Sequence, residues 1–321
     1  MGVLDHSILW PYDDKGETRE FFYSRYAHPT VVEAERQLGE LDGGTAVLFP
    51  SGAGATTALV LSLLQPGDTI ALGAGVYYGT GVLFETLARW GLQHVEFDQT
   101  GAPPGGVQLV WLEAPSNPFL TMPDLAAAAA HPAPVVVDST AATPVLLRPL
   151  EHGADFVVHS VTKYLGGHDD ILLGVVVCRD AAAAEELKVF RSRTGISPAA
   201  EQAWLLLRSL RTLEMRVRQQ SASAAIVAAR LDEHPKVSVV RYPGLGGMLS
   251  FDVADGDAAR RVETSTRLIV NSTSLGSVTS LIESRARWEG DRVPPGLLRL
   301  SVGLEDPEAI WADLAQALET A

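Results

Sequence analysis

Two short apolar runs, each ending in polar residues, constrain most strongly how this chain can fold. Residues 135–137 are valines that lead into Asp138, and residues 156–158 lead into a polar stretch that ends in Lys163. Unbroken apolar runs of this length are typical of parallel strands that are buried on both faces. Because open α/β sheets bind ligands at the carboxyl ends of their strands, we expect both polar clusters to face one crevice.

A carboxylate and a lysine in the same crevice indicate pyridoxal 5'-phosphate as the cofactor. An enzyme of this kind needs a lysine that forms an imine with the cofactor aldehyde and an aspartate that keeps the pyridine nitrogen protonated. Lys163 and Asp138 fit these roles, and Ser160 and Thr162 offer hydroxyl groups for the phosphate. A lysine after a strand is more often a solvated surface residue, but the Ser-x-Thr-Lys context favours the cofactor role.

A turn of small residues follows the apolar residues 46–49 and opens a helical pattern. Gly52 and Ala53 stand at the start of that pattern, where free N–H groups and the helix dipole attract phosphate. A plain tight turn is one alternative. A dinucleotide-binding fingerprint is another, but the third glycine of G-x-G-x-x-G is missing, and Asp68 opens the next strand instead of ending it.

Composition excludes several classes of function. The chain has 321 residues, of which 46% are hydrophobic, enough for a large α/β domain and a smaller one. It contains no apolar run of the roughly 18 residues that a membrane helix needs and no signal peptide, so we expect a soluble, cytoplasmic protein. The single Cys178 fits a reducing compartment, and the net charge of −14 argues against nucleic acid or an anionic membrane as a partner. We predict no metal site.

Motifs along the chain resemble those of the Cys/Met metabolism family of pyridoxal-phosphate enzymes, which includes cystathionine γ-lyase, methionine γ-lyase and cystathionine γ-synthase. They are, in order, YSR, SGAGA, YGT, SNP, DST, SVTK, LRTL, SLG and RLSVG. The resemblance implies the α/β fold-type I, similar to aspartate aminotransferase, with a mostly parallel sheet in a large domain and a smaller C-terminal α/β domain. We place an N-terminal arm at 1–30, the cofactor domain with a long connecting helix at 31–220, and the small domain at 221–321.

The resemblance also assigns cofactor contacts. It implies that Tyr23 and Arg25 reach across a dimer interface to the neighbouring subunit's cofactor phosphate, as an arginine fork and a phenol can bind an anion. Tyr78, expected at a strand end, would stack on the cofactor ring and act as an acid or base, although a core tyrosine is the alternative. Asn117 would bind the phenolic oxygen of the cofactor, and Thr140 completes this set. His28 stands where the family usually has asparagine.

Substrate contacts follow from the same resemblance. Arg299 matches the arginine that grips the substrate α-carboxylate, and Ser274 and Asn117 match residues on the substrate side. Cystathionine enzymes often carry acidic residues at the positions of Phe22 and Thr273, where they suit a distal ammonium group. An unpaired buried ammonium is costly, so we favour methionine or homocysteine as the substrate, with cystathionine still open.

The predicted reaction is cleavage of a carbon–sulfur bond by γ-elimination, or by β-elimination, giving a 2-oxo acid, ammonia and a thiol. Lys163 would remove the α-proton, and Tyr78 would protonate the leaving sulfur. One alternative is γ-replacement, as in cystathionine γ-synthase or an O-acyl-homoserine sulfhydrylase; another is a non-catalytic interaction module with the same fold. A homodimer is the smallest assembly that brings Tyr23 and Arg25 to a partner's site. A homotetramer is the less secure alternative, because the family usually carries a longer segment before YSR that helps to build the tetramer, and most of that segment is missing here.

Overall fold

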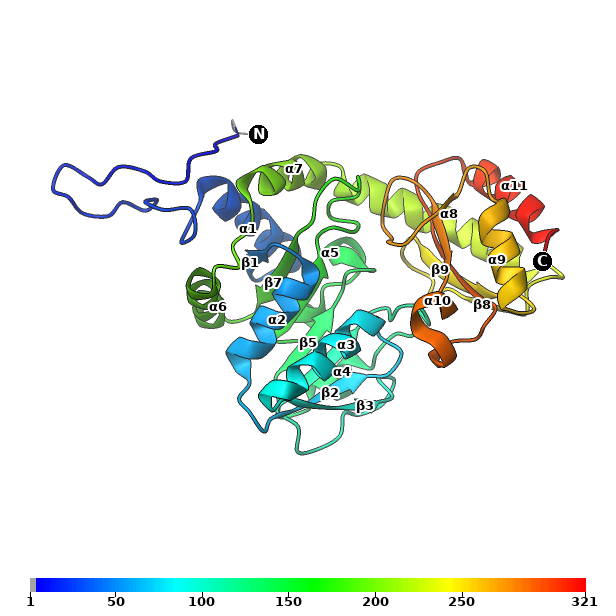
Figure 1. Cartoon of the computed structure of the whole chain (residues 1–321), viewed down its shortest axis with the longest axis horizontal. Coiled ribbons are helices and arrows are strands. Elements are labelled where there is room, and N and C mark those ends of the chain that lie inside the picture. Colours follow the sequence, from blue (N-terminus) through cyan, green and yellow to red (C-terminus); the bar gives the residue numbers. More distant parts are fainter. Residues whose placement is uncertain (1–3) are drawn as a thin grey trace.

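The structure, a computed structural model, describes residues 4–321 and contains two β-sheets connected by a long helix (Figure 1). The larger sheet has seven strands in the order β1-β7-β6-β5-β4-β2-β3. Strand β7 is antiparallel to both of its neighbours, and the other pairs are parallel. The strands are β1 (Thr45–Phe49), β2 (Thr69–Gly73), β3 (Gln93–Phe97), β4 (Leu109–Glu113), β5 (Val135–Asp138), β6 (Phe156–Ser160) and β7 (Gly174–Cys178).

Helices cover both faces of this sheet, which explains the continuous apolar strands. In β7, Val176 packs into the core cluster of α2, α3 and α6, whereas Val175 and Val177 pack into the cluster of α1, α7 and α8 on the opposite face. The helices of this part are α1 (Pro29–Asp42), α2 (Gly52–Leu63), α3 (Tyr78–Leu87), α4 (Leu125–Ala129), α5 (Thr143–Leu146), α6 (Ala181–Thr194), α7 (Ala200–Leu210) and α8 (Leu213–Asp232), with 3₁₀ turns η1 (Ala88–Trp90) and η2 (Pro149–His152).

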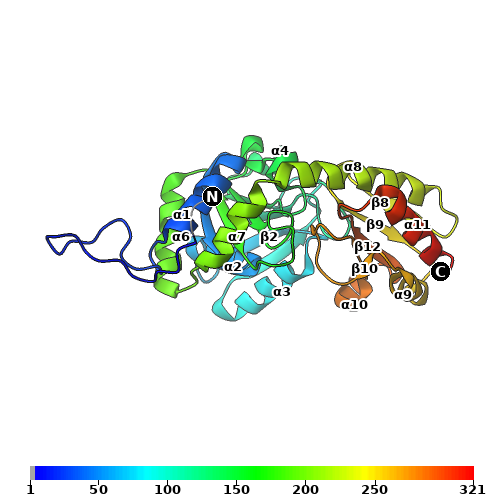
Figure 2. The same ribbon diagram turned by 90° about the horizontal axis from the view of Figure 1, so that it is seen from above.

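The second sheet has five strands in the order β10-β11-β12-β9-β8. Only β10 and β11 are parallel; the other described pairs are antiparallel. Its elements are β8 (Val239–Arg241), β9 (Met248–Asp252), α9 (Gly256–Ser265), β10 (Val270–Asn271), β11 (Leu281–Ser284), α10 (Ala286–Glu289), η3 (Gly290–Arg292), β12 (Leu297–Ser301) and α11 (Pro307–Leu318). Helix α8 runs from the first sheet to the second, as the view from above shows (Figure 2). Among residues 4–321, no helix is long and apolar enough to cross a membrane.

The predicted long connecting helix is interrupted between α7 and α8. The buried guanidinium of Arg216 spans this break and donates to the Ser209 carbonyl oxygen at 3.1 Å, near the end of α7. It also donates to the Tyr164 carbonyl oxygen at 2.8 Å, so the break lets one cation satisfy carbonyl groups of two segments. Apolar periodicity continues on both sides of the break and therefore gave no sign of it.

The N-terminal arm, residues 4–27, extends away from the body in both views (Figures 1 and 2). It folds back on itself, because the Trp10 N–H donates to the Phe22 carbonyl oxygen at 3.1 Å and the Ser24 N–H donates to Ile8 at 2.8 Å. The arm ends at His28, whose Nδ1 accepts from the Thr30 N–H at 3.1 Å and caps α1. His28 thus performs the capping role for which asparagine is well suited.

Candidate active site

A cavity of about 280 Å³ lies between the two sheets. The carboxyl ends of β4, β5 and β6 form one side of it, together with the first turns of α2 and α3. Strand β12 and the segment between β10 and β11 approach from the other side. The predicted site residues that line this cavity are Gly52, Ala53, Tyr78, Asn117, Asp138, Thr140, Ser160, Thr162, Lys163, Ser274 and Arg299.

The start of α2 forms a cradle of hydrogen-bond donors. Ser51 caps the helix by accepting from the Gly54 N–H at 2.9 Å, so Gly52 and Ala53 occupy the first two helical positions, whose N–H groups have no preceding turn to bind. A Cβ atom on Gly52 would lie only 3.2 Å from the Ser160 hydroxyl oxygen. Glycine therefore keeps this corner open for a ligand that meets both the amides and the hydroxyl group.

Asp138 ends β5 and is held by its neighbour Thr140. The N–H and the hydroxyl group of Thr140 donate to Oδ1 of Asp138 at 3.0 and 2.5 Å. Burial raises the pKa of Asp138, and the two donors from Thr140 act against that rise. A cationic nitrogen placed against this carboxylate would favour its ionised form.

Lys163 follows β6 and points toward the second sheet. Its Nζ donates to the Ser274 hydroxyl oxygen at 2.6 Å. Burial, and secondarily the positive charge of Arg299, lower the pKa of Lys163 to about 8. A substantial fraction of this amine is therefore neutral near physiological pH, which a nucleophile or base requires. The other hydroxyl side chain of the motif, Thr162, accepts from the Leu173 N–H at 3.1 Å and so also supports the local loop.

Tyr78 lines the cavity from the first turn of α3, not from the end of a strand as predicted. Strand β2 ends at Gly73, and the intervening turn carries the chain to Tyr77, which precedes the helix. The Tyr77 N–H donates to the Glu113 carboxylate at 2.5 Å, and that contact anchors the start of α3. The sequence placed the residue in the right cavity but on the wrong element.

Arg299 is buried on β12 and contacts both sides of the cavity. It donates to Oδ1 of Asn117 at 3.0 Å and to the Ser274 carbonyl oxygen at 2.7 Å. It also forms a very short contact with Glu283. Burial is the main reason that the pKa of Arg299 falls to about 10, at which it still carries its charge at neutral pH.

Three further charged residues at this site were not predicted. Glu113 ends β4 as Asp138 ends β5, a signal that the sequence offered; burial raises its pKa well above the usual range. Glu283 and Arg285 come from the end of β11, and both are 2% exposed. They form an ion pair at 2.6 Å, and no apolar run ending in polar residues marked them in the sequence.

Tyr23 and Arg25 do not line the cavity of their own chain. Arg25 donates to the Ser192 carbonyl oxygen at 2.5 Å, and its guanidinium lies 4.7 Å from the ring centre of Tyr26. Both predicted residues belong to the arm that extends from the body. Their predicted role in a neighbouring subunit is therefore compatible with this geometry and remains a prediction.

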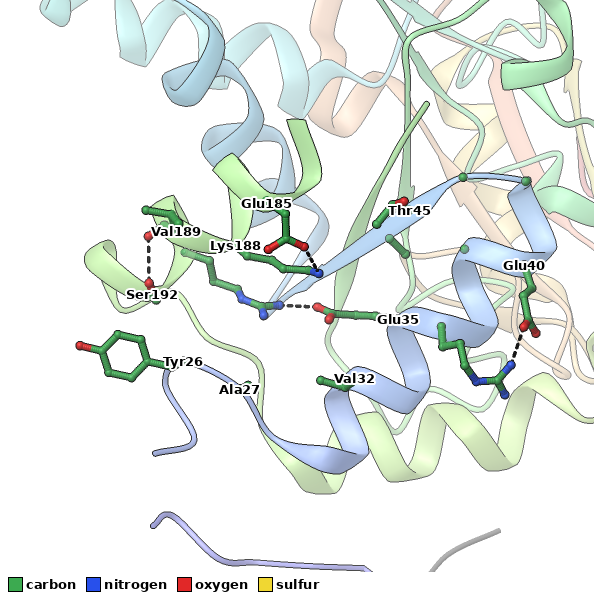
Figure 3. Close-up of a pocket in the computed structure, with 16 residues that line it drawn as sticks. Tyr26, Ala27, Val32, Glu35, Glu40, Thr45, Glu185, Lys188, Val189 and Ser192 are labelled. Carbon is green, nitrogen blue, oxygen red and sulfur yellow. Dashed lines mark hydrogen bonds and ion pairs between the residues drawn. The ribbon is translucent and has the colours of Figure 1, made fainter. Parts of the chain in front are cut away.

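A second, more open cavity of about 780 Å³ lies between α1, β1 and α6 (Figure 3). Its charged centre is the ion pair of Arg191 with Glu35 at 2.5 Å, and Arg191 also donates to the Leu48 carbonyl oxygen at 2.7 Å. These contacts tie α6 to α1 and to the edge strand β1. None of the predicted site residues lines this cavity, so the smaller cavity between the sheets is the candidate active site.

Comparison with known proteins decides the family. The family model for Cys/Met metabolism PLP-dependent enzymes matches residues 5–319. The chain belongs to this family. Its cofactor is therefore pyridoxal phosphate, and the predictions of fold-type I and of an enzyme acting on sulfur amino acids are confirmed.

Relatives within the family differ in their reactions. The chain is 37% identical to an L-methionine γ-lyase of Pseudomonas putida, over 95% of this chain and 86% of the relative. It is also 37% identical to a cystathionine γ-synthase of Mycobacterium bovis, over 93% of this chain and 86% of the relative. A crystal structure of a cystathionine γ-lyase from Micromonospora echinospora superposes with a TM-score of 0.93 at 35% identity, covering 99% of this chain and 93% of that one. This Cys/Met metabolism enzyme is thus similar to lyases and synthases alike.

The residues of the cavity fit pyridoxal phosphate. The N-terminus of α2 and the Ser160 hydroxyl group provide a corner, kept open by Gly52, that suits a phosphate. The amine of Lys163 suits an aldehyde, and the Asp138 carboxylate suits a protonated ring nitrogen. The donor set therefore matches the three polar ends of the cofactor.

The lowered pKa of Lys163 predicts how the apoprotein captures the cofactor. Only the neutral amine attacks an aldehyde, so the rate of cofactor capture should rise with pH and level off above about 8. Stopped-flow absorbance at a series of pH values measures this rate. Ser274→Ala removes the oxygen to which Nζ donates, and we expect it to move the midpoint to lower pH. A rate that still rises about tenfold per pH unit above pH 9 would contradict the assignment.

Proposed function

We propose that this enzyme cleaves the carbon–sulfur bond of an amino acid by γ-elimination and releases a 2-oxo acid, ammonia and a thiol. The observation that carries the proposal is the convergence of Lys163, Asp138, Tyr78 and Arg299 on one cavity. These side chains supply a base, a carboxylate for the cofactor ring, a phenol and a cation for the substrate. Elimination and replacement share this machinery, and the substrate decides between them.

Bound pyridoxal phosphate supplies an electrophilic carbon for amines and a protonated ring that accepts the electrons left behind by a departing proton. Its phosphate end is held by the N–H groups at the start of α2 and by the hydroxyl groups of Ser160 and Thr162. Thr140 holds the carboxylate of Asp138 in place. Asp138 keeps the ring nitrogen protonated by pairing with it. Asn117 and Tyr78 limit how the ring can turn, the former by a hydrogen bond and the latter by stacking.

Once the substrate amine has replaced Lys163 at the cofactor aldehyde, the freed amine of Lys163 can accept and donate protons. Its Nζ, with a pKa near 8, takes the proton from the α-carbon of the substrate. A second proton then leaves the β-carbon, and the electron pair left there expels the sulfur from the γ-carbon. The Ser274 hydroxyl group, 2.6 Å from Nζ, orients that amine. Tyr78 donates a proton to the leaving sulfur, which lowers the barrier by avoiding a free thiolate in a largely buried cavity.

Arg299 holds the α-carboxylate of the substrate, and the charges around it disfavour a distal ammonium group. Glu283 is shared by Arg299 and Arg285, and Glu113 accepts from the N–H groups of Tyr77 and Asn117. Neither carboxylate is therefore free to pair with a second ammonium. This disfavours a substrate such as cystathionine, whose distal end carries an ammonium group.

The working unit in this proposal is a homodimer in which each arm completes the partner's cavity. In the described chain, Leu9 is 69% exposed and Ile8 is 57% exposed, and the arm that carries them extends from the body (Figure 1). Exposed apolar side chains on an extended segment favour contact with another protein surface. Tyr23 and Arg25 then bind the phosphate of the partner's cofactor.

Product analysis tests the proposed reaction. With methionine, homocysteine or cystathionine as the substrate, we expect 2-oxobutanoate to be released together with a thiol. The matched assay supplies O-acetylhomoserine and cysteine and measures cystathionine. Release of 2-oxobutanoate at a rate far below that of cystathionine formation would replace elimination with γ-replacement, the alternative that the synthase relatives support.

A further inference from the structure

Arg285 is a buried cation in the cavity, and the reaction outlined above gives it no role. It follows β11, is 2% exposed and lines the same cavity as Lys163. Its guanidinium carbon lies 5.6 Å from the ring centre of Tyr78. Arg285 therefore stands beside the group that is to meet the far end of the substrate.

The guanidinium of Arg285 is only partly satisfied. Nη1 donates to Oε1 of Glu283 at 2.6 Å, and Nε donates to Oε1 of Glu289 at 3.0 Å. Nη2 lies 3.0 Å from the same Glu289 oxygen but in a direction that makes no hydrogen bond, so it has no acceptor among the described residues. A buried charged donor without an acceptor is costly, and an incoming anion would remove that cost.

Arg285 is also one of two cations that share a single carboxylate. Arg299 and Arg285 both donate to Oε1 of Glu283. After burial, repulsion from Arg285 is the next largest cause of the lowered pKa of Arg299. The only other carboxylate that contacts Arg285 among the described residues is Glu289, whose own pKa is raised by burial. The cavity thus holds two guanidinium groups that an anionic ligand would stabilise.

We propose that Arg285 selects amino acids whose side chain ends in an anionic group beyond the γ carbon, while Arg299 takes the α-carboxylate. This inference rests on the proposed function of the cavity and specifies the charge of the substrate's distal end. A carboxylate there accepts from Nη2 and from its neighbours in the planar fork. A neutral methyl group leaves Nη2 without a hydrogen-bond acceptor, and an ammonium group is repelled.

Binding of three amino acids that differ only at the far end tests this selection. L-Norleucine ends in a methyl group, L-2-aminoadipate has a carboxylate in its place, and L-ornithine has an ammonium group there. All three lack a leaving group on the γ carbon. For the cofactor-loaded enzyme, we expect calorimetry to give a Kd for L-2-aminoadipate at least about tenfold below that for L-norleucine, with L-ornithine the weakest.

Substitutions assign the preference to Arg285. In R285Q, we expect the Kd values for L-2-aminoadipate and L-norleucine to agree within about twofold, since the charge is lost and the length is nearly kept. The matched control is R292Q, because Arg292 is 58% exposed and only 3.7 Å ion pairs link it to Glu85 and Glu96. This control should retain the full preference. E289Q removes a competitor for Arg285 and should tighten L-2-aminoadipate further.

Two results would overturn the proposal: tighter binding of L-norleucine than of L-2-aminoadipate by the unchanged enzyme, or an unchanged preference in R285Q. If R285Q does not fold or load cofactor, E289Q decides, and weaker binding of L-2-aminoadipate in E289Q argues against the proposal. The order of the three ligands does not depend on turnover. An enzyme that shows the expected order but releases no 2-oxobutanoate therefore contradicts only the proposed elimination.

Discussion

Replacing Lys163 with alanine is expected to abolish turnover, with kcat lowered at least about 10⁴-fold, because one amine both anchors the cofactor and moves the α-proton. The neighbouring groups do not replace it. Ser274, which accepts from Nζ at 2.6 Å, is a hydroxyl group and far too weak a base for an α-proton. The purified variant should also lose the visible absorbance of the cofactor bound to the lysine, which a spectrum of the protein measures.

The matched control for this change is Lys188→Ala. Lys188 lies on α6, is 32% exposed and pairs with Glu185 at 2.7 Å, outside the cavity between the sheets. Its removal should leave both the spectrum and the turnover unchanged, since surface ion pairs of this kind contribute little to stability. Intact lysine-bound absorbance in the Lys163→Ala protein would reject the assignment of the anchoring residue.

The part of the site that is built on strand ends could be predicted from the sequence. Residues 135–137 and 156–158 are buried on both faces of the sheet, and that burial makes them readable as strands. Parallel neighbours then bring Asp138 and Lys163 to one edge as a matter of geometry. The position of Tyr78 was harder, because the turn between β2 and α3 depends on the Tyr77 contact with Glu113, a residue of another strand.

The part of the site that comes from the second sheet could not be derived from local pattern. Arg299 and Ser274 were assigned through family resemblance, and nothing in their own segments marks a ligand. Glu283 and Arg285 were missed because an ion pair of two buried groups depends on how β11 and β12 pack against the first sheet. Residues of these types usually lie on the surface, and here burial removes their charges from the screening of water.

Mixed dimers are expected to show that the arm acts across the subunit interface. Arg25→Ala should weaken cofactor binding about 10- to 100-fold through the loss of a charged phosphate contact, and Lys163→Ala should be inactive. In a dimer that carries one of each, the subunit with Lys163 receives its Arg25 from the partner. Random pairing of the two chains should therefore restore about one quarter of the wild-type activity at limiting cofactor.

The activity of the mixture shows whether Arg25 acts in the partner's site or in its own chain. If Arg25 acts in its own chain, where it donates to the Ser192 carbonyl oxygen, every mixed dimer joins two defective sites and no activity returns. Arg36→Ala serves as the control, because Arg36 is 52% exposed on α1 and pairs with Glu33 and Glu40 of the same helix. A mixture of Arg36→Ala with Lys163→Ala should keep the activity of its Lys163-bearing chains, about half of the wild-type value, since each of those sites is complete. Activity that is restored by the first mixture, and absent when either chain is assayed alone, requires the arm to complete the partner's cavity.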